Sequence, residues 1–277
     1  MRWKQFFTPV KSIAAEQVRE FMETRSSGEI TTLDVRQPNE YETGHIPGAK
    51  LIPLPDLNNR LGEIDPNKPV IVYCAIGGRS RVAAQMLAGT GFKEVLNLSG
   101  GFKAWKSKAA FGPEMQGLEL FTGAESLEEA LVVSYSLEAG LRDFYHSMIP
   151  KVENEDARGL FKKLSEIEVK HQDRIFDEYL KISGKSKTRE AFEKSIVSQA
   201  VEGGLSTEAY INMFQPDWES VIDIIELAMS IEAQALDLYQ RASERSSAPQ
   251  TRKVLVQIAD EERAHLAQLG KLIESIK

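Results

Sequence analysis

The feature that most constrains this chain is a repeat of metal-ligand side chains in its C-terminal half. Three residues return at the same interval of 94 positions, giving the pairs Glu138 and Glu232, Glu168 and Glu262, and His171 and His265. The flanking sequence repeats as well, because SLEAGLRDFY at 136–145 aligns with SIEAQALDLY at 230–239. A duplicated helix hairpin is the simplest explanation of a repeat of this kind.

Long helical periodicity runs through the same half of the chain from Glu125 onward. It predicts four main helices, at about 125–149, 153–182, 217–245 and 249–276. Short connections join the helices of each pair, and a long crossover at 184–216, with a short helix expected at 188–201, joins the pairs. One long crossover between two hairpins is the topology of a ferritin-like four-helix bundle.

The repeated side chains are suited to holding two metal ions. Residues three apart on a helix point the same way, so each Glu-x-x-His motif places a carboxylate and an imidazole on one face. One Glu from each of two helices, with Glu-x-x-His from each of the other two, is the di-iron carboxylate pattern. Oxygen ligands with one imidazole per metal suit iron or manganese better than a soft metal, and two iron ions are expected, with manganese possible. Tyr145 and Tyr239 follow Glu138 and Glu232 by seven residues and are either supports of this site or ordinary core aromatics.

On these six positions, the region of about 125–277 resembles the rubrerythrin and ferritin-like family. The resemblance implies a non-haem di-iron centre that reacts with dioxygen or hydrogen peroxide, and it implies a homodimer. Rubrerythrins carry a further ligand glutamate one turn after the third-helix Glu, and here that position is Ala235. A rubredoxin centre needs four cysteines and the chain has one, so electrons are expected from an external donor.

The N-terminal residues have a different pattern, in which short apolar runs alternate with helical segments. Three runs read as buried strands (Ile30–Asp34, Val70–Tyr73 and Val95–Leu98), and Ala14–Met22 and Arg79–Leu87 read as helices. Alternation of this kind predicts an α/β fold, a parallel sheet covered by helices on both faces.

The only cysteine, Cys74, lies between a predicted strand and a predicted helix. It is followed by Ala75, Ile76, Gly77 and Gly78, and then by Arg79 and Ser80. The loop amides and the helix N-terminus favour the nucleophilic thiolate, and the two glycines let the loop curl. Arg79 offers a cation to an anionic substrate. Phosphatases of related fold use Cys-x5-Arg, and the shorter Cys-x4-Arg spacing here favours sulfur as the transferred atom.

This loop and its surroundings closely resemble the rhodanese family over about 8–107. The matching stretches are Leu33-Asp34-Val35-Arg36, Glu40-Tyr41, Gly44–Ala49, Cys74–Ser80, Gly100-Gly101-Phe102 and Trp105. The resemblance implies a persulfide on Cys74, formed from a small sulfur-donor anion such as thiosulfate and passed to a thiophilic acceptor. It also implies that Asp34 and Arg36 support the site.

The expected organisation is therefore a rhodanese-like sulfurtransferase domain at 1–108, a linker at 109–123 and a rubrerythrin-like di-iron bundle at 124–277. A net charge of −7 argues against a nucleic-acid or anionic-membrane partner. Apolar runs fall short of the roughly 20 residues that span a bilayer, and a lone thiol suits a reducing compartment, so a cytoplasmic location is expected. The alternative to a bifunctional enzyme is a non-catalytic sulfur- or anion-binding module attached to an iron-binding or ferroxidase domain, because a fold alone does not establish activity.

Overall fold

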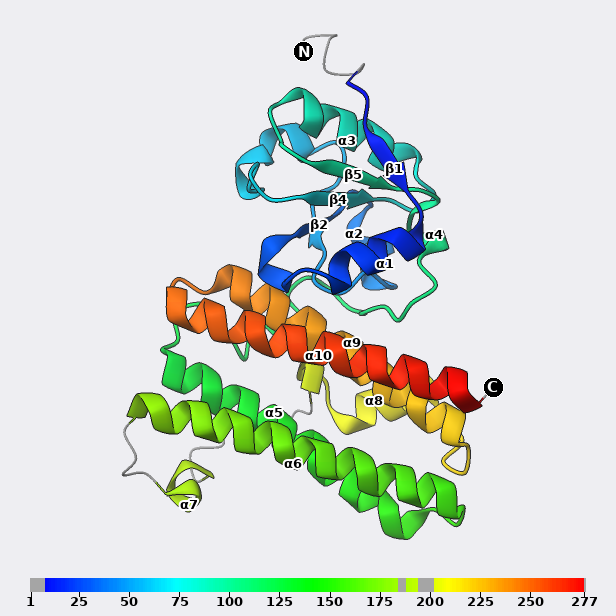
Figure 1. The fold of residues 1–277 in the computed structure, drawn as a ribbon, viewed down its shortest axis with the longest axis vertical. Coiled ribbons are helices and arrows are strands. Elements are labelled where there is room, and N and C mark those ends of the chain that lie inside the picture. Colours follow the sequence, from blue (N-terminus) through cyan, green and yellow to red (C-terminus); the bar gives the residue numbers. More distant parts are fainter. Residues whose placement is uncertain (1–7, 184–187, 194–201, 277) are drawn as a thin grey trace. The chain divides into compact units, whose positions relative to one another are not determined.

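The chain divides into two compact units in a computed structural model, which describes residues 8–183, 188–193 and 202–276 (Figure 1). The units comprise Met1–Gln116 and Gly117–Lys277, so the division falls inside the segment expected to be a linker. Residues on either side of it pack into their own unit. Ala110 pairs with His45 of the first unit, and Phe121 is fully buried in a helical core cluster of the second.

The N-terminal unit is built on a parallel sheet of five strands within the described residues. These are β1 (Lys11–Ile13), β2 (Thr31–Asp34), β3 (Lys50–Leu51), β4 (Val70–Tyr73) and β5 (Val95–Leu98), in the order β1-β5-β4-β2-β3. The central strand β4 pairs in parallel with β2 and with β5. Cys74 follows β4 directly and therefore lies at the carboxyl edge of the sheet, where open α/β sheets bind their ligands.

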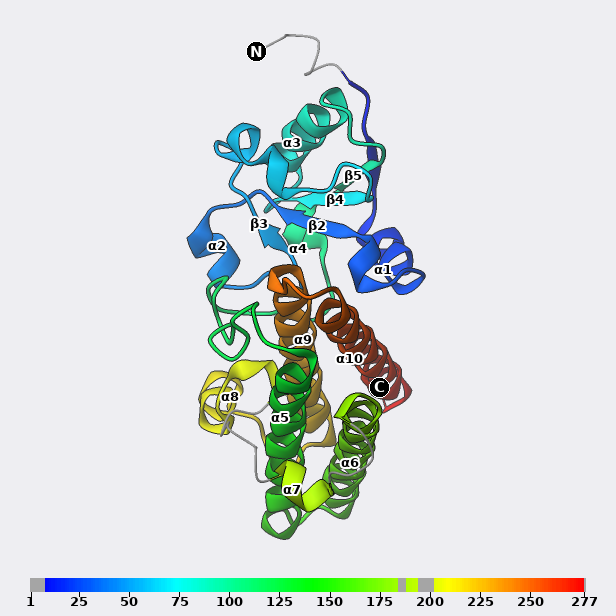
Figure 2. The ribbon, with the colours of Figure 1, turned by 90° about the vertical axis from the view of Figure 1, so that its left-hand side faces the viewer.

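Helices cover both faces of this sheet, as the sequence pattern predicts (Figure 2). Ile71 and Tyr73 of β4 pack in one apolar cluster with three helices, and Val70 and Val72 pack in a second cluster with one helix. The three helices are α1 (Ala15–Glu23), α2 (Pro38–Glu42) and α4 (Gly101–Ala104), and the single helix is α3 (Gly78–Gly89). β1, β3, α2 and α4 are too short to have shown a clear periodicity, and their formation depends on the neighbours that pair with or cap them.

The C-terminal unit has four long helices arranged as two hairpins (Figure 1). They are α5 (Leu127–Met148), α6 (Glu155–Ser183), α9 (Val221–Arg245) and α10 (Pro249–Ile276). α5 packs mainly against α6, and α9 packs mainly against α10. Local signals begin and end these helices. Ser126 and Ser220 accept the backbone amides of Glu129 and Asp223, and Pro150 lies in the 3₁₀ turn that follows α5.

The crossover between the hairpins differs in detail from the expectation. It contains α8 (Thr207–Phe214), which the sequence reading missed, and α7 (Arg189–Glu193), which covers part of the helix expected at 188–201. The rest of that expected helix, residues 194–201, lies outside the described residues. Ser206 caps α8 by accepting the amide of Ala209, a local signal that could have revealed this helix.

The core of the bundle consists of two apolar clusters that meet in the middle of the long helices. Along α5 the first cluster ends at Ala139 and the second begins at Leu141, and along α9 the boundary lies between Ile231 and Ala235. The described residues contain no helix that is both long enough and apolar enough to cross a membrane.

Gly101 links the α4 helix tightly to the Cys74 loop and provides a test of this packing. It has φ +60°, and a Cβ added there would lie 2.2 Å from the carbonyl oxygen of Cys74. The backbone amides of Phe102 and Lys103 donate to the carbonyls of Cys74 and Ala75 at 2.7 and 3.0 Å, so the loop cannot move away freely. Gly101→Ala is expected to lower the free energy of unfolding by about 3 kcal/mol.

Urea unfolding of the full chain measures this loss. Gly62→Ala is the matched control, because a Cβ there meets nothing within 4 Å, and its effect should stay within about 0.5 kcal/mol. Equal stability of the two variants would contradict the close packing of α4 on the loop.

Candidate functional sites

The loop after β4 holds the Cys74 thiol against backbone amides. Gly77 donates its amide to Cys74 Sγ at 3.1 Å. Gly77 has φ +97° and is the N-cap of α3, a left-handed conformation that favours glycine and turns the loop into the helix. The cysteine itself is 1% exposed. The sequence expectation of a strand, a curled loop and a helix N-terminus around this thiol agrees with this arrangement.

The surroundings of the thiol favour its ionised form. Burial raises the pKa of Cys74, but the hydroxyl and amide of Ser80 and the amides of Ile76 and Gly77 lower it by more, so the net pKa lies below its ordinary value. Ser80 is fully buried, and its hydroxyl oxygen lies 2.7 Å from Asn97 Oδ1. The thiolate is the reactive form of cysteine, so these neutral donors prepare Cys74 for nucleophilic attack.

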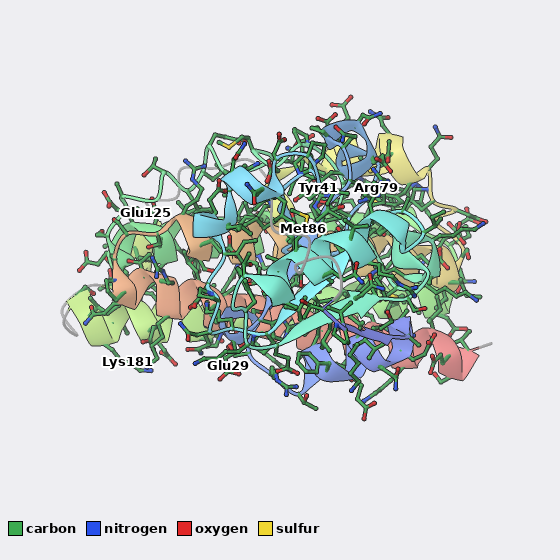
Figure 3. All side chains as sticks on the ribbon, turned by 90° about the horizontal axis from the view of Figure 1, so that it is seen from above. Glu29, Tyr41, Arg79, Met86, Glu125 and Lys181 are labelled. Carbon is green, nitrogen blue, oxygen red and sulfur yellow. The ribbon has the colours of Figure 1, made fainter. Side chains whose placement is uncertain are left out.

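Arg79 is paired with a carboxylate that the sequence reading did not connect to it. Its Nη1 and Nη2 donate to Oε2 and Oε1 of Glu40 at 2.7 and 2.6 Å. Figure 3 labels Arg79 and Tyr41, the residue after Glu40, on neighbouring parts of the N-terminal unit. Arg79 holds the pKa of Glu40 down, at about 2, so the carboxylate is ionised at neutral pH. The two residues are 39 positions apart in the chain and carry no local signal of this contact, which arises because α2 and the start of α3 meet beside the loop.

Asp34 and Arg36 form a buried ion pair at the end of β2. Arg36 Nη2 lies 2.7 Å from Asp34 Oδ2, and the same nitrogen donates to the carbonyl of Gly44 at 2.7 Å. The guanidinium also lies 4.4 Å from the centroid of the Phe102 ring. Arg36 therefore links the end of β2 to Gly44 and Phe102, and a supporting role of Asp34 and Arg36 at Cys74 stays a prediction.

The structure brings the six repeated side chains together as two clusters of three. One comprises Glu138, Glu168 and His171, the other comprises Glu232, Glu262 and His265, and within each cluster one ligand atom per residue lies within 4.8 Å of the others. Each cluster draws on both helices of one hairpin. The imidazole rings of the two clusters stack with centroids 4.2 Å apart and planes 10° apart, so the clusters adjoin through their histidines.

The four glutamates form a polar layer between the two apolar clusters of the bundle. Glu138, Glu168, Glu232 and Glu262 are between 0% and 3% exposed. Burial raises the pKa of Glu168 well above its ordinary value, and the charges of Glu138 and Glu232 add to this effect. Burial likewise raises the pKa of Glu262, to about 7. Such burial of carboxylates is costly unless a positive charge lies among them.

Within the protein, the two histidines supply that positive charge. His171 Nδ1 lies 2.9 Å from Glu168 Oε2, and His265 Nδ1 lies 3.2 Å from Glu262 Oε2. Burial lowers the pKa of each imidazole, but the hydrogen bonds and charges of the two carboxylates in its cluster outweigh burial. They raise the pKa of His171 to about 12 and that of His265 to about 10. A metal ion must displace these protons, so metal binding is expected to release protons.

The donor set fits a pair of metal ions. Oε1 of Glu138, Oε1 of Glu168 and Oε2 of Glu232 are buried and accept no hydrogen bond from the described residues. A cation between the carboxylates and the imidazole of each cluster would satisfy these oxygens. Carboxylate oxygens with one imidazole nitrogen per ion match the preferences of iron and manganese. The equal composition of the two clusters provides for one ion in each.

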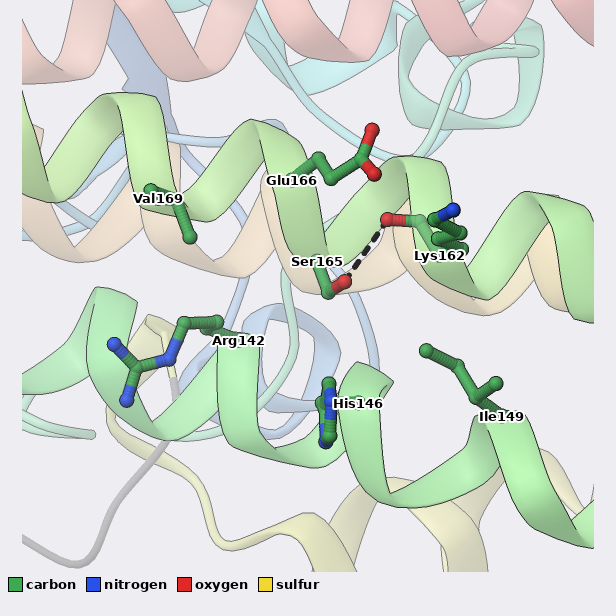
Figure 4. Close-up of a pocket in the computed structure, with 7 residues that line it drawn as sticks. All are labelled: Arg142, His146, Ile149, Lys162, Ser165, Glu166 and Val169. Carbon is green, nitrogen blue, oxygen red and sulfur yellow. Dashed lines mark hydrogen bonds between the residues drawn. The ribbon is translucent and has the colours of Figure 1, made fainter.

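Two other features of the bundle lie outside these clusters. Tyr145 packs against Phe144 and Phe161, and Tyr239 packs edge-on against Phe121, so both rings contribute to the apolar core, and a supporting role at the metals stays a prediction. A cavity of about 440 Å³ opens between α5 and α6 (Figure 4). Its lining comprises Arg142, His146, Ile149, Lys162, Ser165, Glu166 and Val169, none of them among the six ligand candidates.

Comparison with known proteins assigns each unit to a family. A family model described as "Rhodanese-like domain" matches residues 15–108, and one described as "Rubrerythrin" matches residues 129–273, more than half of the chain. The chain therefore belongs to the rubrerythrin family and carries a rhodanese-like domain before its rubrerythrin domain.

Individual relatives match the N-terminal unit. Uncharacterized protein YqhL of Bacillus subtilis is 53% identical over 76 residues, which cover 27% of this chain and 60%, under two thirds, of that relative. Thiosulfate sulfurtransferase GlpE of Ectopseudomonas mendocina is 37% identical over 97 residues, covering 35% of this chain and 85% of that protein. A rhodanese-like domain protein from Staphylococcus aureus is similar in structure, with 29% identity, a TM-score of 0.34, and coverage of 37% of this chain and 98% of that one.

The role of Ser80 in activating Cys74 gives a measurable expectation. Ser80→Ala removes the hydroxyl that lowers the pKa of the thiol, so the pKa should rise. The midpoint of the pH dependence of alkylation by iodoacetamide should move to higher pH. Thr90→Ala is the control, because Thr90 lies at the other end of α3 and its hydroxyl bonds only to the Met86 and Leu87 carbonyls among the described residues. A midpoint that is the same in both variants would contradict the role of the Ser80 hydroxyl in lowering the pKa of Cys74.

Proposed function

We propose that the N-terminal unit is a sulfurtransferase in which Cys74 carries sulfur as a persulfide. The thiolate attacks the sulfane sulfur of a donor, a bond forms between Cys74 Sγ and that sulfur, and the donor's sulfur–sulfur bond breaks. With thiosulfate as donor, the electron pair of the broken bond leaves with sulfite. A thiophilic acceptor then attacks the outer sulfur and regenerates the thiolate. The acceptor is a separate molecule, because the chain has one cysteine.

The observation that carries this proposal is the activated thiol on a loop of inward-facing amides. Gly77 donates to the sulfur, and Ser80, Ile76 and Gly77 lower its pKa. The same amides can stabilise the negative charge of a persulfide, since backbone donors do not need to move when the outer sulfur is added. The name of the Ectopseudomonas mendocina relative, a thiosulfate sulfurtransferase, supports the same chemistry.

We also propose that the helical unit holds two iron ions, one in each cluster of three ligands. Bound iron supplies redox chemistry towards dioxygen or hydrogen peroxide. The chain's own contribution is to hold four carboxylates and two imidazoles on helices that cannot shift without disturbing both apolar clusters. The apolar clusters on either side keep bulk water from the four carboxylates, and an external electron donor completes a catalytic cycle.

Cys74→Ser tests the sulfurtransferase. Serine cannot form a persulfide, so transfer of sulfur from thiosulfate to cyanide should fall by at least about a thousandfold. Mass spectrometry of the thiosulfate-treated wild-type protein should show the mass of one added sulfur atom on the peptide that contains Cys74. Unchanged iron content serves as the internal control for folding of the helical unit. Activity within tenfold of the wild type would rule out a persulfide mechanism.

Glu168→Gln tests the metal centre. The amide keeps the shape of the side chain but is a poor ligand, so iron bound after anaerobic reconstitution should fall from about two to about one per chain. Glu166→Gln is the matched control, because Glu166 is exposed two residues earlier on the same helix, and it should leave the iron content at about two. Well under two irons in the wild type, or equal losses in both variants, would contradict the proposed site.

A further inference from the structure

Arg79, the cation that follows the Cys74 loop, is already paired with a carboxylate of the protein. Arg79 uses both terminal nitrogens in a two-pronged contact with Glu40, at 2.6 and 2.7 Å. Glu40 is fixed in turn at the start of α2, where its Oε2 accepts the backbone amide of Gln37 at 3.1 Å. Contacts in which both nitrogens meet both oxygens are among the strongest and most directional between side chains. A donor anion that binds Arg79 must therefore compete with Glu40.

The rest of the loop carries no charge. Ala75, Ile76, Gly77 and Gly78 lie between the nucleophile and Arg79, and the side chain of Ile76 is 70% exposed. The groups that lower the pKa of Cys74 most are neutral donors, the Ser80 hydroxyl and nearby amides. A second guanidinium near this loop, that of Arg36, is paired with Asp34. Between Cys74 and Arg79 the loop thus presents neutral dipoles and one exposed apolar side chain.

We infer that Glu40 is a specificity-determining residue of this loop, which disfavours dianionic donors such as thiosulfate and favours an organic hydropersulfide, R–S–SH. This inference rests on the proposed sulfurtransferase function. The Cys74 thiolate, the Arg79 cation and the Glu40 carboxylate together carry one net negative charge. That charge repels a dianion, whereas it does not repel the protonated form of a hydropersulfide, which is the form that the thiolate attacks. The exposed Ile76 gives the organic group R an apolar surface to contact.

The transfer balances without an added oxidant or reductant. The Cys74 thiolate attacks the terminal sulfur of R–S–SH, a Cys74 Sγ–S bond forms, and the bond between the two donor sulfurs breaks. Its electron pair leaves with the inner sulfur as the thiolate R–S⁻, and the proton stays on the transferred sulfur. One negative charge enters the step on Cys74 and one leaves on R–S⁻, so charge is conserved.

The test measures persulfide formation on Cys74 of the full-length protein by rapid quenching and mass spectrometry, at a series of donor concentrations. The donors are thiosulfate and the hydropersulfide of N-acetylcysteamine, whose protonated form carries no charge, and rate constants for the second donor refer to that protonated form. The wild type is expected to react at least about tenfold faster with the hydropersulfide, as a second-order rate constant. Glu40→Gln removes the carboxylate charge and should raise the thiosulfate constant about tenfold, while the hydropersulfide constant changes less than about twofold.

Two further variants separate charge from structure. Glu42→Gln removes an exposed carboxylate from the same helix and should leave the ratio of the two constants unchanged. Glu40→Asp keeps the charge, so the ratio should stay near that of the wild type. A role of Glu40 in packing alone would change both donors' constants together in every Glu40 variant and leave their ratio unchanged.

A measurement on the wild type keeps the inference testable if the Glu40 variants fold poorly. Added potassium chloride screens repulsion between like charges, so the thiosulfate constant should rise with ionic strength and the hydropersulfide constant should not. A thiosulfate constant that falls with salt, or a donor ratio equal in wild type and Glu40→Gln, would overturn the role of Glu40 and leave the sulfurtransferase intact. Failure of both donors to modify Cys74 in the wild type would instead overturn the proposed function itself.

Discussion

The C-terminal unit depends on four carboxylates buried in the middle of its helical bundle, because their charge must be compensated there. Each glutamate is almost fully buried between two apolar clusters, where an uncompensated charge is costly. Two imidazoles lie among them, and the carboxylates of each cluster raise the pKa of its imidazole. All four long helices must keep their register for this compensation to hold, because each contributes one glutamate. The candidate metal site therefore depends on the same helix packing that forms the bundle.

The N-terminal unit stabilises negative charge at its reactive group by a different means. There the thiolate faces amides and a hydroxyl, and the guanidinium groups of Arg36 and Arg79 are paired with carboxylates. Neutral donors stabilise a thiolate or a persulfide without binding a free anion strongly. In the bundle, by contrast, the positive charge lies on two protonated imidazoles. A metal ion can replace their protons and take over the role of the counter-charge. The polar groups around Cys74 thus suit a nucleophilic thiolate, and those of the bundle suit a metal ion.

Much of the site could be predicted from sequence because its ligands lie on regular helices. The interval of 94 residues placed Glu138, Glu168 and His171 in the same relation as their counterparts, and helical geometry then put each set on one face. The Cys74 loop was predictable for a similar reason, since a buried strand, two glycines and a helix start are consecutive in the chain. By contrast, the pairing of Arg79 with Glu40 joins elements 39 residues apart, and neither residue carries a local signal of the other. Short elements such as β3 and α2 were missed because two to five residues are too few to show a period.

By itself, the sequence determined the two-unit organisation, the α/β and helical fold classes, and which side chains could bind metal or act as nucleophile, because these follow from periodicity and spacing along the chain. Only the tertiary structure decided that the two half-sites adjoin through stacked imidazoles, and that the cation beside Cys74 is matched by a carboxylate. Both facts concern the distance between segments remote in sequence. Such distances are set by how the apolar faces of β4, α2 and α3, and of the four long helices, pack together, and no local pattern encodes them.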